Sequence, residues 1–360
     1  MMSRTEAVSR RNCGQAILWA ALATALSVSV AHAQNAFQFA VIGDMPYTKV
    51  QEREFAFVLA ELNRADLAFV VHVGDFQFDA RPYNQNPALA SMPCVDDNYR
   101  ATYNLFQNIR HPVILTPGDN DWTDCWPLQA QKVDPLEALG KIRTLFYPDG
   151  KSLGQRTMPV HSQSQEPQFA KFRENLRWSI QGVTFATLHI VGSNDNFGRT
   201  PEMDAEHIER KAANIAWMKA AFARAKADGS RALVLMTQAN PGFENYWPPA
   251  AKSRYFGPFF GRGQPPAKPA SAFDDYIAAL QDELESYDRP VAYLHGDTHL
   301  FRIDKPLYGK KTNRLFENFT RVETFGWPDT HWVQVTVDPA SPGLFRFEAK
   351  IVAENVVNRR

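Results

Sequence analysis

The feature that most constrains the fold of this chain is a Gly-Asp pair that recurs at the ends of apolar segments. The pairs contain Asp44, Asp75, Asp119 and Asp297, and the segments before them have the composition of buried strands. A glycine permits a tight turn at the carboxyl end of a strand, and a carboxylate there points into the crevice where open α/β sheets bind ligands. Because several carboxylates in one crevice repel one another, the pattern predicts a two-metal site.

A single aspartate after a strand has a simpler explanation, because it can serve only as a turn former or a helix cap. The chain has 19 glycines, and chance supplies about one Gly-Asp pair in a chain of this composition. Four recurrences, each after an apolar segment, therefore favour a shared site over four unrelated turns.

The apolar pattern predicts strands that alternate with helices, followed by a tail of antiparallel strands. We expect strands at 37–42, 67–73, 112–116, 183–191, 232–236 and 291–294, helices at 50–64, 97–110, 135–147, 205–227 and 272–287, and tail strands at 315–323, 331–338 and 343–351. This order predicts an α/β fold whose loops carry the function. No linker divides it, so we expect one domain over 34–360, with a surface excursion rich in proline and aromatic residues at 240–271.

Residues 1–33 have the pattern of a cleaved signal peptide. Arginines precede an apolar stretch at 16–30, and Ala31-His32-Ala33 offers small residues to a signal peptidase. The alternative is a membrane anchor, but the apolar stretch is shorter than the roughly 20 residues that a spanning helix needs. Ser9-Arg10-Arg11 also partly resembles a twin-arginine signal, so the general and the twin-arginine export routes both stay open. We expect an exported protein, periplasmic or secreted, with no stable membrane span after cleavage.

Charge and cysteine usage limit the partners and the redox state. The formal net charge is zero and no basic run occurs, which argues against a nucleic-acid partner. Cys13 lies in the signal, which leaves Cys94 and Cys125 in polar, loop-like sequence. In an exported protein such a pair favours a disulfide over two free thiols. The bridge would tie the loop after Asp75 to the loop after Asp119.

The order of these motifs resembles the calcineurin-like metallophosphoesterases. That family's blocks run Asp-x-His, Gly-Asp, Gly-Asn-His-Asp/Glu, a lone His and Gly-His-x-His, and the corresponding stretches here are Gly43–Pro46, Gly74-Asp75, Gly118–Asp121, Thr237-Gln238 and Gly296–His299. More closely, the chain is similar to a group of exported bacterial proteins that share the phrases PGDNDWTDC, HGDTHLFRIDKPL and NFTRVETFG, found here at 117–125, 295–307 and 318–326. The resemblance implies a four-layer sandwich, with two packed mixed β-sheets flanked by helices.

The resemblance also implies a ligand set for two metal ions. Asp44 and His299 would hold one ion, Asp119, Gln238 and Asp297 the other, and Asp75 would bridge them. A hydroxide between the ions would attack phosphorus, while both cations stabilise the added charge. Pro46, Asp119, Asn120, Gln238 and Asp297 depart from the family pattern, and His299 is the one usual histidine that remains. An oxygen-rich shell of this kind favours Mn²⁺, Mg²⁺ or Ca²⁺ over Fe or Zn.

Asn120 and Asp121 are the candidate catalytic residues, with Asp121 close enough in sequence to partner a ligand. Asn120 replaces the histidine that in the family contacts substrate and assists the leaving group. An amide can bond a phosphoryl oxygen, but it donates no titratable proton near neutral pH. His72, His189 and His295 lie in apolar strands, where we expect core histidines.

Two functions are consistent with the sequence. One is an exported metal-dependent phosphoesterase acting on small phosphomonoesters or diesters, which the four aspartates and His299 favour. The other is a protein of the same fold that binds a metal or ligand with little hydrolysis, which Pro46 and Asn120 favour.

Arg321 and Glu323, two residues apart in the tail, have the spacing of an ion pair.

Overall fold

The computed structural model describes residues 35–77, 94–125, 133–256 and 271–357. The chain divides into two compact units, 1–34 and 35–360, and every described element belongs to the second. The expected signal at 1–33 and the part of the expected excursion at 257–270 lie outside the described residues. No helix in the described ranges has the length and apolar character that a membrane crossing requires.

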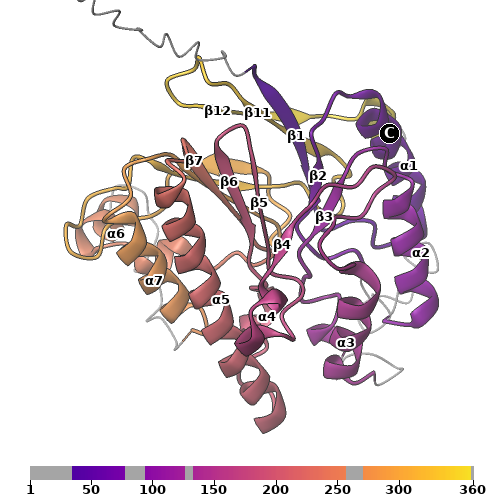
Figure 1. Cartoon of the computed structure of the whole chain (residues 1–360), viewed down its shortest axis with the longest axis horizontal. Helices are drawn as coiled ribbons and strands as arrows, with labels where there is room; N and C mark the ends of the chain where they lie inside the picture. The colour runs from indigo at the N-terminus through magenta and orange to yellow at the C-terminus, as the bar shows by residue number, and fades with distance from the viewer. Residues whose placement is uncertain (1–34, 78–93, 126–132, 257–270, 358–360) are drawn as a thin grey trace, which may run out of the picture. The chain divides into compact units, whose positions relative to one another are not determined.

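Two mixed sheets form the centre of the fold (Figure 1). The first has the order β12-β11-β1-β2-β3 and consists of β1 Phe37–Ile42, β2 Val70–His72, β3 Val113–Leu115, β11 Trp332–Val337 and β12 Phe345–Lys350. The second has the order β4-β5-β6-β7-β8-β10-β9 and consists of β4 His161–Ser162, β5 Leu176–Ile180, β6 Val183–Thr187, β7 Ala232–Met236, β8 Val291–His295, β9 Arg302–Asp304 and β10 Phe319–Glu323. Parallel strands β1, β2 and β3 form one side of the first sheet, and parallel strands β6, β7, β8 and β10 form the middle of the second. Within each set the carboxyl ends share an edge.

Aromatic side chains from both sheets meet in the space between them. Phe39 of β1 stacks on Phe69 with ring centroids 4.7 Å apart. Phe185 of β6 meets both rings edge-on, at 5.6 and 5.2 Å. These rings are fully buried and belong to the larger hydrophobic core. Edge-on and stacked rings at this range stabilise packing beyond the area they bury, so the two sheets are held face to face.

Helices cover the outer faces of both sheets (Figure 1). On the five-stranded sheet lie α1 Lys49–Arg64, α2 Asp96–Gln107 and α3 Pro135–Phe146. On the seven-stranded sheet lie α5 Pro201–Ala227 and α7 Asp274–Leu284, around a second core. The order helix, sheet, sheet, helix confirms the four-layer sandwich. Shorter elements are α4 Gly192–Asp195, α6 Pro249–Phe256, α8 Ala353–Val357 and the 3-10 turns η2 Thr123–Cys125, η3 Gln163–Gln165, η4 Pro167–Phe169 and η5 Phe243–Tyr246.

Helix α1 shows how local sequence sets these boundaries. The hydroxyl of Thr48 accepts a hydrogen bond from the backbone N–H of Gln51 at 3.1 Å, which satisfies one of the unpaired donors at the helix start. Phe55, Val58 and Leu62 are buried at helical spacing and face the sheet. The helix therefore begins five residues after Asp44 and fixes the loop that carries it.

The tail differs from the expectation of three antiparallel strands. β11 and β12 are antiparallel, but β10 pairs in parallel with β8 and joins the other sheet. β6 ends at Thr187, and the buried chain after it turns toward Gly192 instead of continuing as a strand. Strand partners far apart in the sequence leave no local signal, so apolar alternation predicted the existence of β10 and not its partner.

Candidate metal centre

The four predicted aspartates lie at the carboxyl ends of strands from both sheets. Asp44 follows β1, Asp75 follows β2, Asp119 follows β3 and Asp297 follows β8. Gly192 shows how close two of them are: a Cβ there would lie 2.6 Å from Oδ2 of Asp119 and 2.6 Å from Oδ1 of Asp297. Carboxylates from the two sheets therefore face the same small space, and only a residue without a side chain fits beside them.

Three of these aspartates and His299 have left-handed backbone conformations. The φ angles are 53° at Asp44, 58° at Asp75, 81° at Asp297 and 60° at His299. Such a conformation costs about 1 to 3 kcal/mol at a residue other than glycine, and it persists only where the surrounding structure imposes it. The orientation of these four side chains therefore lowers the stability of the fold, and such strained positions are typical of functional sites.

Asp44 and His299 lie together on one side of the site. Nε2 of His299 is 3.5 Å from Oδ1 of Asp44, which also accepts the backbone N–H of Asp297 at 2.9 Å. Nδ1 of His299 lies 2.6 Å from the carbonyl oxygen of Trp327. A carbonyl accepts only, so this contact assigns the proton to Nδ1 and leaves the Nε2 lone pair directed at the site, as in metal-bound histidines.

Gln238, after β7, joins the other side of the site. Its Nε2 donates to Oδ2 of Asp75 at 3.1 Å and to Oδ1 of Asp119 at 3.0 Å. Its Oε1 accepts the backbone N–H of Gly192 at 2.6 Å. An amide binds a metal through oxygen, and here the oxygen is taken by a backbone donor. The structure therefore places Gln238 within the site as a hydrogen-bond donor to two predicted ligands.

Burial and mutual repulsion make this cluster costly without a cation. Asp44, Asp75 and Asp119 are buried. Burial and the neighbouring carboxylates raise the pKa of Asp44 and Asp75 well above the usual range, and burial raises the pKa of Asp119 to about 6. The pKa of Asp297 is raised by the same causes. Among the described residues, no Lys or Arg forms an ion pair with any of the four.

The donor set fits divalent cations. Within the described part of the chain, Oδ2 of Asp44 is buried with no hydrogen-bond partner, and an unpaired buried carboxylate oxygen needs a positive partner. Carboxylate oxygens with one imidazole suit Mn²⁺, Mg²⁺ or Ca²⁺. His, Cys, Asp and Glu side chains of the described residues do not by themselves enclose a metal position in groups of three.

Asn120 reaches the site and Asp121 lies behind it. The Nδ2 of Asn120 donates to Oδ2 of Asp75 at 3.0 Å, and its backbone N–H donates to Oδ1 of the same residue at 3.1 Å. The carboxylate of Asp121 accepts backbone N–H groups of Asp75, Phe76 and Gly118 at 3.0, 2.9 and 2.8 Å. Asp121 therefore positions the loops that carry Asp75 and Asp119, and its oxygens are directed at the backbone.

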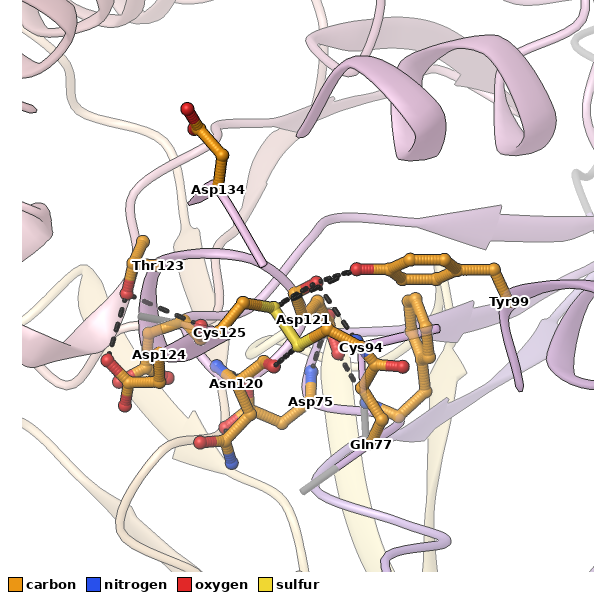
Figure 2. The surroundings of a disulfide bond; sticks show 12 residues. Asp75, Gln77, Cys94, Tyr99, Asn120, Asp121, Thr123, Asp124, Cys125 and Asp134 are labelled. Carbon is orange, nitrogen blue, oxygen red and sulfur yellow. Dashed lines mark hydrogen bonds between the residues drawn. A yellow bond between two sulfur atoms is a disulfide. The ribbon is translucent and has the colours of Figure 1, made fainter. Parts of the chain in front are cut away.

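The predicted disulfide is confirmed, and Figure 2 shows it beside Asn120 and Asp121. Cys94 and Cys125 are bonded, with Cα atoms 5.8 Å apart. The backbone carbonyl of Asp121 accepts the hydroxyl of Tyr99 at 2.7 Å and the amide of Gln77 at 3.0 Å. The bridge and these two contacts hold the segment that carries the candidate catalytic residues.

Sequence reasoning missed Tyr47 and mispaired two charged residues. The buried hydroxyl of Tyr47 lies among the predicted ligands, although only its position three residues after Asp44 hints at this.

Arg321 does not pair with Glu323. Arg321 pairs across the strands with Asp304, and Glu323 with Arg302 at 2.7 Å, because each faces a residue of opposite charge on β9.

The three strand histidines belong to the core, as expected. His72, His189 and His295 are fully buried. Burial lowers the pKa of His72 to about 4 and that of His295 to about 3, so both are neutral near neutral pH. Nε2 of His72 lies 2.9 Å from the carbonyl oxygen of Met45, where it supports the loop between Asp44 and Tyr47.

No protein-family model matches the chain, and no curated protein matches its sequence. Among solved structures, that of PhoD, a protein with a metallophosphoesterase-like fold, aligns with 12% identity and a TM-score of 0.50 over 88% of this chain and 69% of that one. Vacuolar protein sorting 29 from Cryptosporidium parvum aligns over 88% of this chain and 98% of that one, with 10% identity, but its TM-score of 0.31 carries no argument. The likeness to PhoD shows the fold alone, and the fold is metallophosphoesterase-like.

Proposed function

We propose that this chain is an exported, metal-dependent phosphoesterase that hydrolyses small phosphomonoesters or diesters. One observation carries the proposal: four carboxylates without a Lys or Arg partner among the described residues converge with His299 at one edge of two sheets. Buried acids that serve only as structure are normally paired or hydrogen-bonded. Here neutral donors bond some of the oxygens, but no Lys or Arg of the described residues balances the charge at the edge where ligands bind in open α/β folds.

Each predicted ligand has a role that its position supports. Asp44 and His299 would hold one cation, Asp119 and Asp297 would hold the other, and Asp75 would contact both. When bound, the two cations neutralise the carboxylates, activate a water molecule and stabilise the charge that develops on phosphorus. Gln238 donates to Asp75 and Asp119 at once, so it keeps one oxygen of each carboxylate in a fixed orientation.

Asn120 supplies the contact to the substrate. It is partly exposed, and its amide nitrogen lies beside Asp75 at the site. This nitrogen can donate to a phosphoryl oxygen but has no titratable proton for the leaving group. The site is therefore best suited to esters whose leaving group departs without protonation, such as aryl phosphates.

Export agrees with two separate features of the chain. Residues 1–33 have the pattern of a signal peptide. The disulfide between Cys94 and Cys125 braces the segment that contains Asn120 and Asp121. Such bridges persist in oxidising compartments outside the cytoplasm.

Metal analysis followed by hydrolysis assays tests the proposal. Purified protein is dialysed, its metal content is measured, and aryl phosphomonoesters and diesters are offered with Mn²⁺, Mg²⁺ or Ca²⁺. We expect the wild-type protein to bind metal and to hydrolyse at least one ester. Both properties should be lost in Asp75→Asn. Both should be kept in the control Asp149→Asn, because the side chain of Asp149 is 89% exposed. Metal binding without hydrolysis would support the alternative, a protein that binds a metal or ligand with little hydrolysis, and absence of metal binding would contradict the phosphoesterase.

A further inference from the structure

The hydroxyl of Tyr47 lies at the centre of three predicted metal ligands. Its oxygen is 3.5 Å from Oδ1 of Asp44, 3.2 Å from Oδ2 of Asp75 and 3.3 Å from Nε2 of His299. Nδ2 of Asn120 approaches the same oxygen at 3.2 Å. The Tyr47 side chain is buried, with 2% of its surface exposed. The oxygen thus has four polar neighbours from four separate segments.

Hydrogen bonding alone does not account for this arrangement. A phenol carries one proton, so Tyr47 can donate to only one of its neighbours at a time. The two carboxylates and the Nε2 of His299, whose proton is on Nδ1, all offer lone pairs toward the phenol oxygen. When the two carboxylates are ionised, as metal binding requires, at least two of these contacts join lone pairs with no proton between them, and such contacts are repulsive unless a cation lies among them.

The separations match the edges of a coordination shell. Neighbouring oxygen or nitrogen ligands of an octahedral ion with bonds of about 2.1 to 2.4 Å lie roughly 3 to 3.5 Å apart. The three distances from the Tyr47 oxygen fall in this range, and so does the 3.5 Å between Asp44 and His299. We propose that the Tyr47 oxygen is itself a metal ligand, which completes the donor set formed with Asp44, Asp75 and His299. This inference rests on the proposed function.

Hydrogen bonds to helix α1 hold the loop after β1 in the position that places the Tyr47 oxygen in the site. The backbone N–H of Tyr47 donates to Oε1 of Gln51 at 2.7 Å, within the first turn of α1. Nε2 of Gln51 in turn donates to Thr330 at 3.1 Å. Pro46 occupies the position at which the resembled pattern has a metal-binding histidine, and the next residue supplies an oxygen donor.

The test compares Tyr47→Phe with Tyr287→Phe. The hydroxyl of Tyr287 is buried and has no hydrogen-bond partner among the described residues, so its removal is a matched control. Calorimetric titration with Mn²⁺ is expected to show about 10- to 100-fold weaker binding at one of two sites in Tyr47→Phe and unchanged binding in Tyr287→Phe. Fe³⁺ serves as a spectroscopic probe, because a coordinated phenolate gives a visible charge-transfer band. That band is expected in wild type and Tyr287→Phe and not in Tyr47→Phe.

The outcomes separate this inference from the proposed function. If wild type binds two Mn²⁺ ions and Tyr47→Phe binds them equally well, Tyr47 is not a ligand, while the metal site stands. Iron-loaded wild type without the visible band contradicts ligation by Tyr47 even if the variant does not fold. If wild type binds no divalent ion, the proposed function fails and the role of Tyr47 fails with it.

Discussion

The amide nitrogen of Gln238 lies 3.1 Å from Oδ2 of Asp75, so a side chain that follows the seven-stranded sheet contacts a carboxylate that follows the five-stranded sheet. Gln238 also contacts Asp119, and Asp119 faces Asp297 across Gly192. Both sheets thus contribute to one site, and their face-to-face packing sets the distance between the ligands. We therefore expect a change that shifts one sheet against the other to alter the proposed metal binding even when it lies far from the site.

Asp75→Asn is expected to remove metal binding more completely than Gln238→Ala. Asp75 is proposed to contact both cations and carries a charge, whereas the Gln238 nitrogen only orients two ligands. A charged bridge between two dications stabilises the site far more than a neutral amide does. Metal content measured on both variants at equal purity checks this ranking. Two ions retained in Asp75→Asn would contradict the bridging role.

Metal should stabilise the protein more at neutral pH than in acid. Burial raises the pKa of Asp119 to about 6 and that of Asp121 to about 7, above the values near 4 of unfolded chains. The folded state then binds more protons, so the stability that these groups contribute is present below about pH 4 and is lost as the pH rises through about 7. A metal ion requires the predicted ligand Asp119 to be deprotonated and replaces its proton in that window.

The measurement is the melting temperature with and without Mn²⁺ across the same pH range. The difference at each pH cancels the contributions of groups remote from the site. We expect the gain from Mn²⁺ to be larger at about pH 7.5 than at about pH 5. A gain that is constant over this range, or larger in acid, would show that the buried carboxylates do not take up the metal.

Strand-end aspartates could be predicted from the sequence because their signal is local. The apolar segment and the glycine stand directly before Asp44 and Asp297, and the carboxyl edge of a parallel sheet follows from that order. The role of Tyr47 could not be predicted in the same way. Its hydroxyl reaches Asp75 and His299 only because of the turn between β1 and α1, which spacing alone does not specify.

Orientation of polar groups was the other part that sequence could not provide. Gln238 was predicted to bind a metal through its amide oxygen, but the direction of its amide depends on the N–H of Gly192, 46 residues away. The partners of Arg321 and Glu323 depend on the register of β9 against β10. Both are set by long-range contacts, which leave no periodic trace in the chain.

Loss of the disulfide is expected to weaken both the fold and the site. The bridge joins residues separated by 31 positions, and its removal in a Cys94→Ala/Cys125→Ala variant should cost about 3 to 4 kcal/mol of unfolding free energy. Mn²⁺ affinity should fall as well, because Asn120 and Asp121 lie in the braced segment. Urea denaturation and metal titration measure the two effects. Unchanged stability together with unchanged affinity would show that the bridge does not support the site.

Gly192→Ala should abolish binding of the second cation with little loss of fold. The added Cβ would lie 2.6 Å from oxygens of both Asp119 and Asp297, closer than real Cβ contacts come, so one carboxylate or the loop must move. Gly140→Ala is the matched control, since a Cβ at that helical position meets nothing within 4 Å and alanine favours a helix by up to about 1 kcal/mol. Metal content and circular dichroism of both variants provide the comparison. Two ions bound by Gly192→Ala with wild-type affinity would place the second cation away from Asp119 and Asp297.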